Sequence, residues 1–584
     1  EKLANRDLVN DPRKIYTYVG LPNKKTLSDA ENAFTVNNSY ITYQKLGISE
    51  SDPDREAKRE RIIKFIHGFD SYDWDLNGIT DEKRKASYIN DSGQTVQVEW
   101  ILGAFIHSKP LIIHYGDKSV IYAGANDGML HAFDDSDGRE LWAFIPPSLL
   151  SKLKDFESNN TLQIFVDGTP KAYIERKRDG SIQKVYIIFG LRRGGDRYLA
   201  LDVTNYNAPK LLWEIAPPTS SPLLGHEVTT GFDRLGQTWS APLIKKVASG
   251  NGSKVVAFFA GGYDTCNDPN MSCGSTQKGN ALYAIDIENG SLLWSFSNAD
   301  MKFSIPSDIT ALDTNNDGNV DRLYVGDLGG QLWRFDIKNL DNIGEWQGKR
   351  IFRANQSSSE KRKIFYPPDV SFESDYEWVY FGTGDRENPK QETGTASFPT
   401  QNRLYAIKDR NPSTPLTEGN LVDVTSDILQ KPNPTPEDIN LQRQTLNNLN
   451  TSSGWFITLE NKGEKTTASP VIFGGIVYYT TFTPSYPTEG DICFLGEGTA
   501  RVYALQYKTG NAAFNFDLEN DTEERKIIYK SDRSMIIGAG IPSQVVIAVV
   551  KGNVVGYVGV GGGIFSPEMG SKKNIIPLYW RRVF

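Results

Sequence analysis

The stretch that decides the fold is Ile121-Tyr-Ala-Gly-Ala-Asn-Asp-Gly-Met-Leu-His-Ala-Phe-Asp-Asp-Ser-Asp-Gly-Arg-Glu-Leu-Trp142. A run of strand-forming residues ends in Ala123-Gly124, and the turn sequence Asn126-Asp127-Gly128 follows almost directly. Asn-Asp-Gly and Asp-Gly turns favour the left-handed backbone conformations that tight hairpins require. A second turn, which ends at Gly138, leads to a strand that carries Trp142. The stretch therefore predicts three consecutive strands joined by tight turns.

Variants of this phrase of strands and glycine-containing turns recur downstream, and the last of them is a partial copy. They lie at 186–213, 256–294, 323–336, 379–407, 475–510 and 554–559. Six to seven such units predict an all-β chain built by radial repetition. The number of copies disfavours the alternative, a pair of β-sandwiches. The units are spaced more widely than a standard blade, so we expect insertions, with exposed loops at 386–401 and 409–454.

The first hundred residues differ from the rest. The range 54–69 combines a charged first half with the apolar sequence Arg61-Ile-Ile-Lys-Phe-Ile, which is typical of an amphipathic helix. We expect residues 1–100 to form a partly helical segment packed on the propeller. We expect residues 101–584 to form the propeller itself, with a calcium loop at 313–321.

The charge and hydropathy of the chain limit the kinds of partner that it can bind. The 584-residue chain has a formal net charge of −8 and a pI of about 5.5, which disfavours nucleic-acid binding. Its longest apolar runs, such as 545–550, are too short to cross a bilayer, so no transmembrane segment is expected. Of the three cysteines, Cys266 and Cys273 share a turn-rich loop and form a candidate disulfide, while Cys493 is left over.

The most specific chemical motif is an acidic loop that begins at residue 313. Oxygen-bearing side chains occupy its positions 1, 3, 5 and 9, and Gly318 is at position 6, which is the spacing of an EF-hand calcium loop. Alternate positions of a tight loop bring hard oxygens to one point. Position 12 is Tyr324 instead of the usual bidentate glutamate. The alternative is a turn without metal. The predicted Ca²⁺ ligands are Asp313, Asn315, Asp317, Asn319 (through its carbonyl) and Asp321.

A second loop repeats the spacing near the N-terminus. Apolar Trp74 and Leu76 lie between its oxygen-bearing residues, so this loop is interpreted either as a metal site or as a structural turn. The candidate ligands are Asp73, Asp75, Asn77, Ile79 (through its carbonyl) and Asp81.

Several of these phrases resemble the C-terminal domain of the type IV pilus-associated PilC/PilY family. The resemblance covers the chain from about residue 60 to its end and is carried by 123–134, 261–266, 313–336, 106–110 and 381–385. It implies a modified seven-bladed, quinoprotein-like propeller whose calcium site regulates pilus extension and retraction and so twitching motility. It also implies an exported protein at the cell surface, pilus tip or outer membrane. Pilus subunits and a host-cell surface receptor are the implied partners, with a role in adhesion and virulence.

Two further interpretations stay open from the sequence. Ala132 to Trp142 and Ala284 to Trp294 resemble a phrase of quinoprotein dehydrogenases, which would make the chain an enzyme with a quinone and calcium. The chain has no adjacent cysteine pair of the kind that flanks that cofactor, so we predict binding and assembly without catalysis. A pure scaffold, with calcium as a structural staple, is the other alternative. The chain has no Arg-Gly-Asp sequence, because 193–196 carries an extra glycine.

Overall fold

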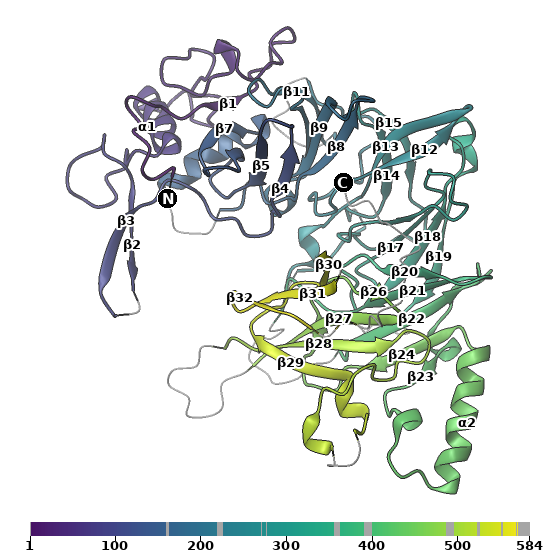
Figure 1. The fold of residues 1–584 in the computed structure, drawn as a ribbon. Helices are drawn as coiled ribbons and strands as arrows, with labels where there is room; N and C mark the ends of the chain where they lie inside the picture. The colour runs from purple at the N-terminus through teal and green to yellow at the C-terminus, as the bar shows by residue number, and fades with distance from the viewer. Residues whose placement is uncertain are drawn as a thin grey trace.

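A computed structural model describes the chain except for a set of short ranges. These ranges are 1, 91, 159–162, 219–225, 270, 276, 356–361, 390–399, 486–495, 522–525, 551–552, 568 and 570–584. Sheets of antiparallel strands follow one another along an arc, from the N-terminal part of the chain to its C-terminal part (Figure 1). We call the first six large sheets blades 1 to 6.

Blades 2, 3 and 4 are meanders, in which strands that are consecutive in the sequence are neighbours in the sheet, and the other three blades add one strand to such a meander. Blade 1 comprises β4 (Leu111–His114), β5 (Ser119–Gly124), β6 (Leu130–Asp134), β7 (Glu140–Ile145) and β1 (Ile15–Thr17). Blade 2 comprises β8 (Lys171–Arg176), β9 (Ile182–Gly190), β10 (Tyr198–Asp202) and β11 (Lys210–Ile215). Blade 3 comprises β12 (Leu243–Ser249), β13 (Gly252–Ala260), β14 (Leu282–Asp286) and β15 (Leu292–Phe296).

The later blades follow the same plan with small additions. Blade 4 comprises β16 (Thr310–Leu312), β17 (Arg322–Gly326), β18 (Gln331–Asp336) and β19 (Gln347–Arg353). Blade 5 comprises β20 (Asp369–Phe372), β21 (Glu377–Gly382), β22 (Arg403–Asp409), β24 (Gly454–Thr458) and β23 (Val422–Asp423). Blade 6 comprises β25 (Lys465–Thr466), β26 (Val471–Phe473), β27 (Ile476–Thr483), β28 (Thr499–Gln506) and β29 (Ser534–Ala539).

The chain ends in a smaller sheet of β30 (Val546–Val550), β31 (Asn553–Val560) and β32 (Gly563–Phe565). It has three described strands where the blades have four or five, so the predicted seventh blade stays a prediction. A separate hairpin pairs β2 (Lys85–Ile89) with β3 (Thr95–Glu99). Within the described residues, no helix has the length and apolar character needed to cross a membrane.

The repeated alanine–tryptophan phrase has a packing role. Across the third and fourth strands of blades 1 and 3, Ala132 lies opposite Trp142 and Ala284 lies opposite Trp294. The small alanine leaves room for the indole ring beside it. The Nε1–H of Trp142 donates over 2.7 Å to the carbonyl of Tyr206, which lies between β10 and β11 of blade 2. The tryptophan of the phrase thus links neighbouring blades. This packing role explains why the phrase is present, and no cofactor is needed to explain it.

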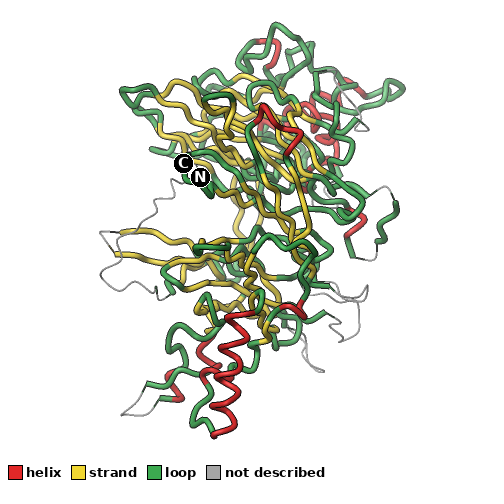
Figure 2. The backbone as a smooth tube through the Cα atoms, turned by 90° about the vertical axis from the view of Figure 1, so that its right-hand side faces the viewer, coloured by secondary structure: helices red, strands yellow, loops and turns green. Residues whose placement is uncertain are grey.

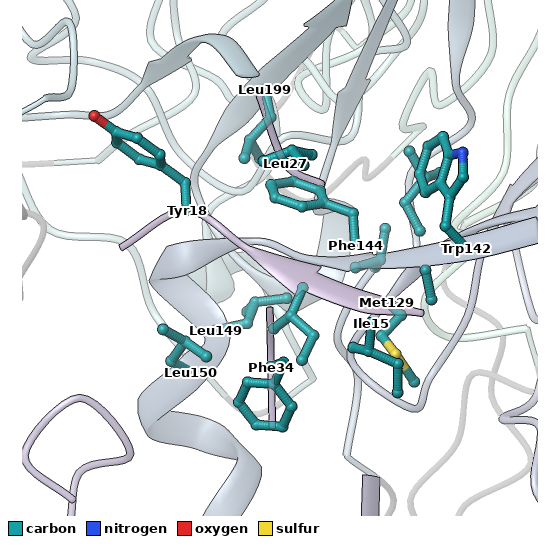
Figure 3. Packing of buried hydrophobic residues seen from close by; sticks show 14 of the residues in the cluster. Ile15, Tyr18, Leu27, Phe34, Met129, Trp142, Phe144, Leu149, Leu150 and Leu199 are labelled. Carbon is teal, nitrogen blue, oxygen red and sulfur yellow. The ribbon is translucent and has the colours of Figure 1, made fainter. Parts of the chain in front are cut away.

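The N-terminal residues share a core with blade 1. Strand β1 pairs with β7 in parallel, and Ile15 and Phe34 pack with Phe144 and Leu149 in one buried cluster (Figure 3). Helix α1 (Arg55–His67), which falls in the range predicted for a helix, adds buried isoleucines to the same cluster. The described part of residues 1–100 therefore contributes both a strand and core side chains to the first blade.

A buried charge network ties this N-terminal part to blade 1. The Arg13 guanidinium donates to both carboxylate oxygens of Glu140, over 2.8 and 2.7 Å, and to the carbonyl of Ile66 in α1. His131 lies between two acids, with Nδ1 2.8 Å from Glu140 and Nε2 3.0 Å from Asp127. Its ring is fully buried, but the two carboxylates outweigh the burial and raise the pKa of His131 to about 9. His131 is therefore a satisfied structural residue that stays protonated at neutral pH.

We expect this network to make stability fall as the pH rises towards 9. Because the folded pKa of His131 lies above the usual 6.5, its contribution is complete below that value and is lost on passing the folded pKa. The free energy of unfolding should drop by about 2 kcal/mol between about pH 7 and pH 9.5. Urea unfolding across this range measures the drop. His131→Gln should remove most of this pH dependence, and an equal decline in that variant would rule out His131 as the cause.

The insertion at 409–454 differs from the exposed loop that its composition predicts. It contains the sixteen-residue helix α2 (Pro436–Thr451), which lies beyond the sheet of blade 5 in both views (Figures 1 and 2). Thr435 and Asp438 form a capping box at its start, and Pro436 takes the first helical position. Lys408 Nζ donates to three carbonyls at its end, those of Leu449, Asn450 and Ser452. Capping at both ends therefore offsets the weak helix propensity of its many asparagines.

Candidate metal centre

The acidic loop 313–321 connects the first two strands of blade 4, β16 and β17. Its last residues are fixed from two sides. The buried Val320 donates its N–H to the carbonyl of Lys246 in blade 3 over 2.9 Å, and Asp321 bonds Leu312 and Ile337 through its backbone. The loop is therefore anchored at the contact between blades 3 and 4, while its first half is exposed.

Carboxylate oxygens shape the interior of the loop. Asp313 accepts from the N–H of Asp317 over 3.1 Å and from that of Gly318 over 2.7 Å. Asp321 accepts from the N–H and the hydroxyl of Thr314, so both ends of the loop point carboxylates at its own backbone. Gly318 has a φ of +88°, a left-handed conformation that explains glycine at the sixth position.

The loop carries negative charge that no described residue neutralises by an ion pair. Among the described residues, no lysine, arginine or histidine nitrogen lies within 4.0 Å of the carboxylates of Asp313, Asp317 or Asp321. The Asn319 N–H donates to Asp317 over 2.8 Å and lowers the pKa of that carboxyl, so it is ionised at neutral pH. The Asn319 side-chain oxygen is buried without a hydrogen-bond partner. Hard oxygens without a cation are the donor set that calcium requires.

Tyr324 does not supply the missing ligand at the twelfth position. Its ring is fully buried in blade 4, and its hydroxyl donates to Asp409 over 2.5 Å. Any further ligand would have to come from solvent or from the second carboxylate oxygen of Asp321.

The second loop, 73–81, has the same internal turn but a different charge balance. Asp73 accepts from the N–H of Gly78 over 3.1 Å, as Asp313 does from Gly318. However, Lys64 lies 3.1 Å from Asp81, and Lys85 lies 3.9 Å from Asp75. Two lysines therefore already neutralise carboxylates that a metal would need, which favours the structural turn.

Two of the three cysteines are paired in the structure. Cys266 and Cys273 are joined by a disulfide bond in the loop that follows β13, with their Cα atoms 4.8 Å apart. Cys493 lies outside the described residues.

The structure also brings together three residues that the sequence analysis did not single out. Ligand atoms of Glu214, His226 and Glu227 all lie within 4.8 Å of one another, and this is the one such trio among the described residues. Arg197 Nη1 lies 3.4 Å from Glu214 and 3.3 Å from Glu227, so a cation already sits beside both carboxylates. The trio is therefore a partly buried ion-pair network. His226 and Glu227 are adjacent in the sequence and Glu214 precedes them by twelve residues, a spacing that matches no metal motif.

Comparison with known proteins places the chain in a family. The family model of the PilY1 beta-propeller domain matches residues 113–431, more than half of the chain. The chain belongs to the PilY1 β-propeller family. A type IV pilus biogenesis factor PilY1 of Pseudomonas aeruginosa is 30% identical over 450 residues, which cover 68% of this chain and 35% of the relative. A PilY1 homolog of Xylella fastidiosa is 28% identical over 417 residues, covering 67% of this chain and 26% of the relative.

A solved structure supports the fold. The C-terminal domain of Pseudomonas aeruginosa PilY1 aligns with a TM-score of 0.51 and 22% identity, covering 76% of this chain and 92% of that domain. The resemblance stated from the sequence is thus confirmed at the level of the family, and the all-β propeller is confirmed as the fold class. The chain spans between 26% and 41% of the length of the PilY1 relatives it matches.

Proposed function

We propose that this chain is the calcium-responsive propeller of a type IV pilus biogenesis factor, exported to the cell surface or pilus tip. Family membership supports the pilus-associated role, since the relatives carry the name pilus biogenesis factor. The observation that carries the calcium assignment is the group of three carboxylates at Asp313, Asp317 and Asp321, which have no described cationic partner within 4.0 Å.

Calcium would draw these carboxylates together and neutralise them. Asp313, Asn315, Asp317, Asp321 and the carbonyl of Asn319 would hold the ion, which supplies charge compensation and rigidity to the loop. Val320 links the loop to Lys246 in blade 3, so a change in the loop would reach the contact between two blades. We propose that this contact is how calcium influences pilus extension and retraction.

The partners in this proposal are pilus subunits, with a host-cell surface receptor as the partner in adhesion. In the alternative, calcium is a permanent structural ion. The two proposals differ in the calcium affinity that they predict for the loop. A loop of this kind can bind anywhere from about 10⁻⁷ to 10⁻³ M, and weak, reversible binding favours the switch. No observation favours the dehydrogenase alternative, because the Ala–Trp phrase that suggested it has a packing role in the blades.

The test is a bacterium that carries Asp321→Ala in its own copy of the gene. We expect pili to assemble but twitching zones to lose their dependence on external calcium, because the loop no longer responds to the ion. Asp81→Ala, at the same position of the other loop, is the matched control and should behave like wild type. Calcium-dependent twitching in the Asp321→Ala strain, at wild-type protein level, would contradict the proposal.

A further inference from the structure

The disulfide bond of blade 3 lies in a loop that is open to solvent on one side. Cys266 belongs to the short 3-10 helix η4 (Thr265–Asn267), between β13 and β14, and is joined to Cys273. Cys273 is exposed, whereas Cys266 is partly buried, and the side-chain amide of Asn267 lies 3.6 Å from the Cys266 sulfur. The two halves of the disulfide therefore differ, because one residue is open to solvent and the other faces an amide donor of the protein.

Asp268 follows η4, inside the loop that the disulfide closes. Its carboxylate accepts from Arg193 Nη2 over 2.7 Å and from the hydroxyl of Tyr263 over 2.8 Å. Arg193 lies in the connection between β9 and β10 of blade 2, so this ion pair joins two neighbouring blades. The side chains of Arg193 and Asp268 are only 22% and 26% exposed. Solvent and salt therefore screen this pair less than a pair on the open surface.

The same guanidinium reaches a third blade. Arg193 Nε donates over 2.8 Å to the carboxylate of Glu387, which lies between β21 and β22 of blade 5. The guanidinium also lies over the rings of Trp239 and Tyr263, at 5.4 and 5.3 Å from the ring centres. All three loops connect the second and third strands of their blades. One arginine thus joins blades 2, 3 and 5, and we call Arg193, Asp268 and Glu387 the inter-blade clamp.

The backbone around Asp268 depends on the disulfide for its position. Asp264 fixes the two ends of the loop, because its carboxylate accepts from the N–H of Cys266 over 3.0 Å and from that of Lys278 over 2.7 Å. Among the described residues of 269–277, the backbone makes one backbone hydrogen bond, from Met271 to Asp268. Loss of the crosslink would therefore give this stretch conformational freedom that few other contacts oppose.

We propose that the Cys266–Cys273 disulfide is a redox-sensitive switch, which in its oxidised form holds Asp268 against Arg193 and so keeps the inter-blade clamp closed. A dithiol reductant opens it. One thiolate of the reductant attacks the exposed Cys273 sulfur, the bond between the two cysteines breaks, and Cys266 leaves as a thiolate that takes up a proton. The second thiol of the reductant then displaces Cys273. The protein gains two thiols, and the reductant becomes a disulfide.

Reduction would leave the clamp with one of its two carboxylates. Asp268 could then move away with its loop, while Glu387 would still bind Arg193 from blade 5. The edge where the three blades meet would open locally more often, although the sheets themselves would stay folded. The calcium loop lies in blade 4, so this switch stands or falls independently of the proposed function.

The test is hydrogen exchange, read by mass spectrometry, of the 584-residue chain with and without dithiothreitol. Cys493→Ser in every protein leaves Cys266 and Cys273 as the one possible disulfide within the chain. We expect reduction to speed exchange of the backbone amides of 191–197 by about tenfold or more, as for the loss of a charged hydrogen bond. Replacing both Cys266 and Cys273 by serine should give the same fast exchange without reductant.

Two carboxylate variants decide whether the disulfide acts through the clamp. In Asp268→Asn the exchange at 191–197 should be fast already, and reduction should change it by less than about twofold, because the two changes break the same contact. Glu387→Gln is the matched control, since it removes a carboxylate from the same arginine but in a loop without the disulfide. Reduction should still speed exchange in that variant by about tenfold.

The outcomes separate a switch from a local crosslink. Unchanged exchange at 191–197 on reduction of the parent chain would overturn the proposal, and so would an equal acceleration in the parent chain and in Asp268→Asn. Should Asp268→Asn fail to fold, as judged by circular dichroism, Arg193→Gln removes the same ion pair from its other side and carries the same expectation.

Discussion

Replacing Glu140 by alanine should lower the free energy of unfolding by about 3–5 kcal/mol. The Glu140 side chain is fully buried and accepts from Arg13 Nε, Arg13 Nη2 and His131 Nδ1. Its removal would leave two buried cations with Asp127 as their remaining close carboxylate, and an uncompensated buried charge is costly. Because Arg13 also bonds Ile66 in α1, the N-terminal part should loosen together with blade 1. Urea denaturation measures the loss.

A comparison with Glu345 tests whether burial, and not the distance between the paired charges, causes this loss of stability. Glu345 lies 2.6 Å from Lys338, as close as Glu140 lies to Arg13, but its side chain is 55% exposed. Solvent screens such a pair, so Glu345→Ala should cost about 0–1 kcal/mol. Glu140→Gln, which keeps the shape and one acceptor oxygen, should fall between the two alanine variants. Equal costs for Glu140→Ala and Glu345→Ala would show that the buried network contributes no special stability.

Features encoded in consecutive residues could be predicted from the sequence. The turn at Asn126-Asp127-Gly128 separates β5 from β6 as expected, and Gly128 has a φ of +96°. The same holds for the loop 313–321, where Gly318 provides the left-handed turn between β16 and β17. A tight turn depends on a few neighbouring dihedral angles, so its sequence signature is local.

Features that depend on distant partners or on end caps were missed. The composition of 409–454 suggested an exposed loop, yet the capping box of Thr435 and Asp438 was the local signal for α2. The parallel pairing of β1 with β7 joins residues about 130 positions apart, and no local pattern encodes it.

Replacing Asp321 by alanine should weaken calcium binding at the 313–321 loop by about 100-fold or more, the largest effect expected for a single substitution here. The loop has three carboxylates and no glutamate at its twelfth position, so Asp321 supplies a third of the neutralising charge. The fold should survive, because the backbone of Asp321 keeps its bonds to Leu312 and Ile337. Calorimetric titration with calcium alone measures the loss.

Asp81→Ala is the matched control, since Asp81 holds the same position in a loop where Lys64 already neutralises it. That variant should bind calcium like wild type, and a loss there would move the ion to 73–81. Binding should also stabilise the folded chain. At calcium about 100-fold above its Kd, the gain is about 2.7 kcal/mol, so a chelator should lower the Tm of wild type but not of Asp321→Ala. A chelator-induced shift of equal size in both proteins would mean that the stabilising ion lies elsewhere, and the carboxylates of this loop would then serve only to shape a turn.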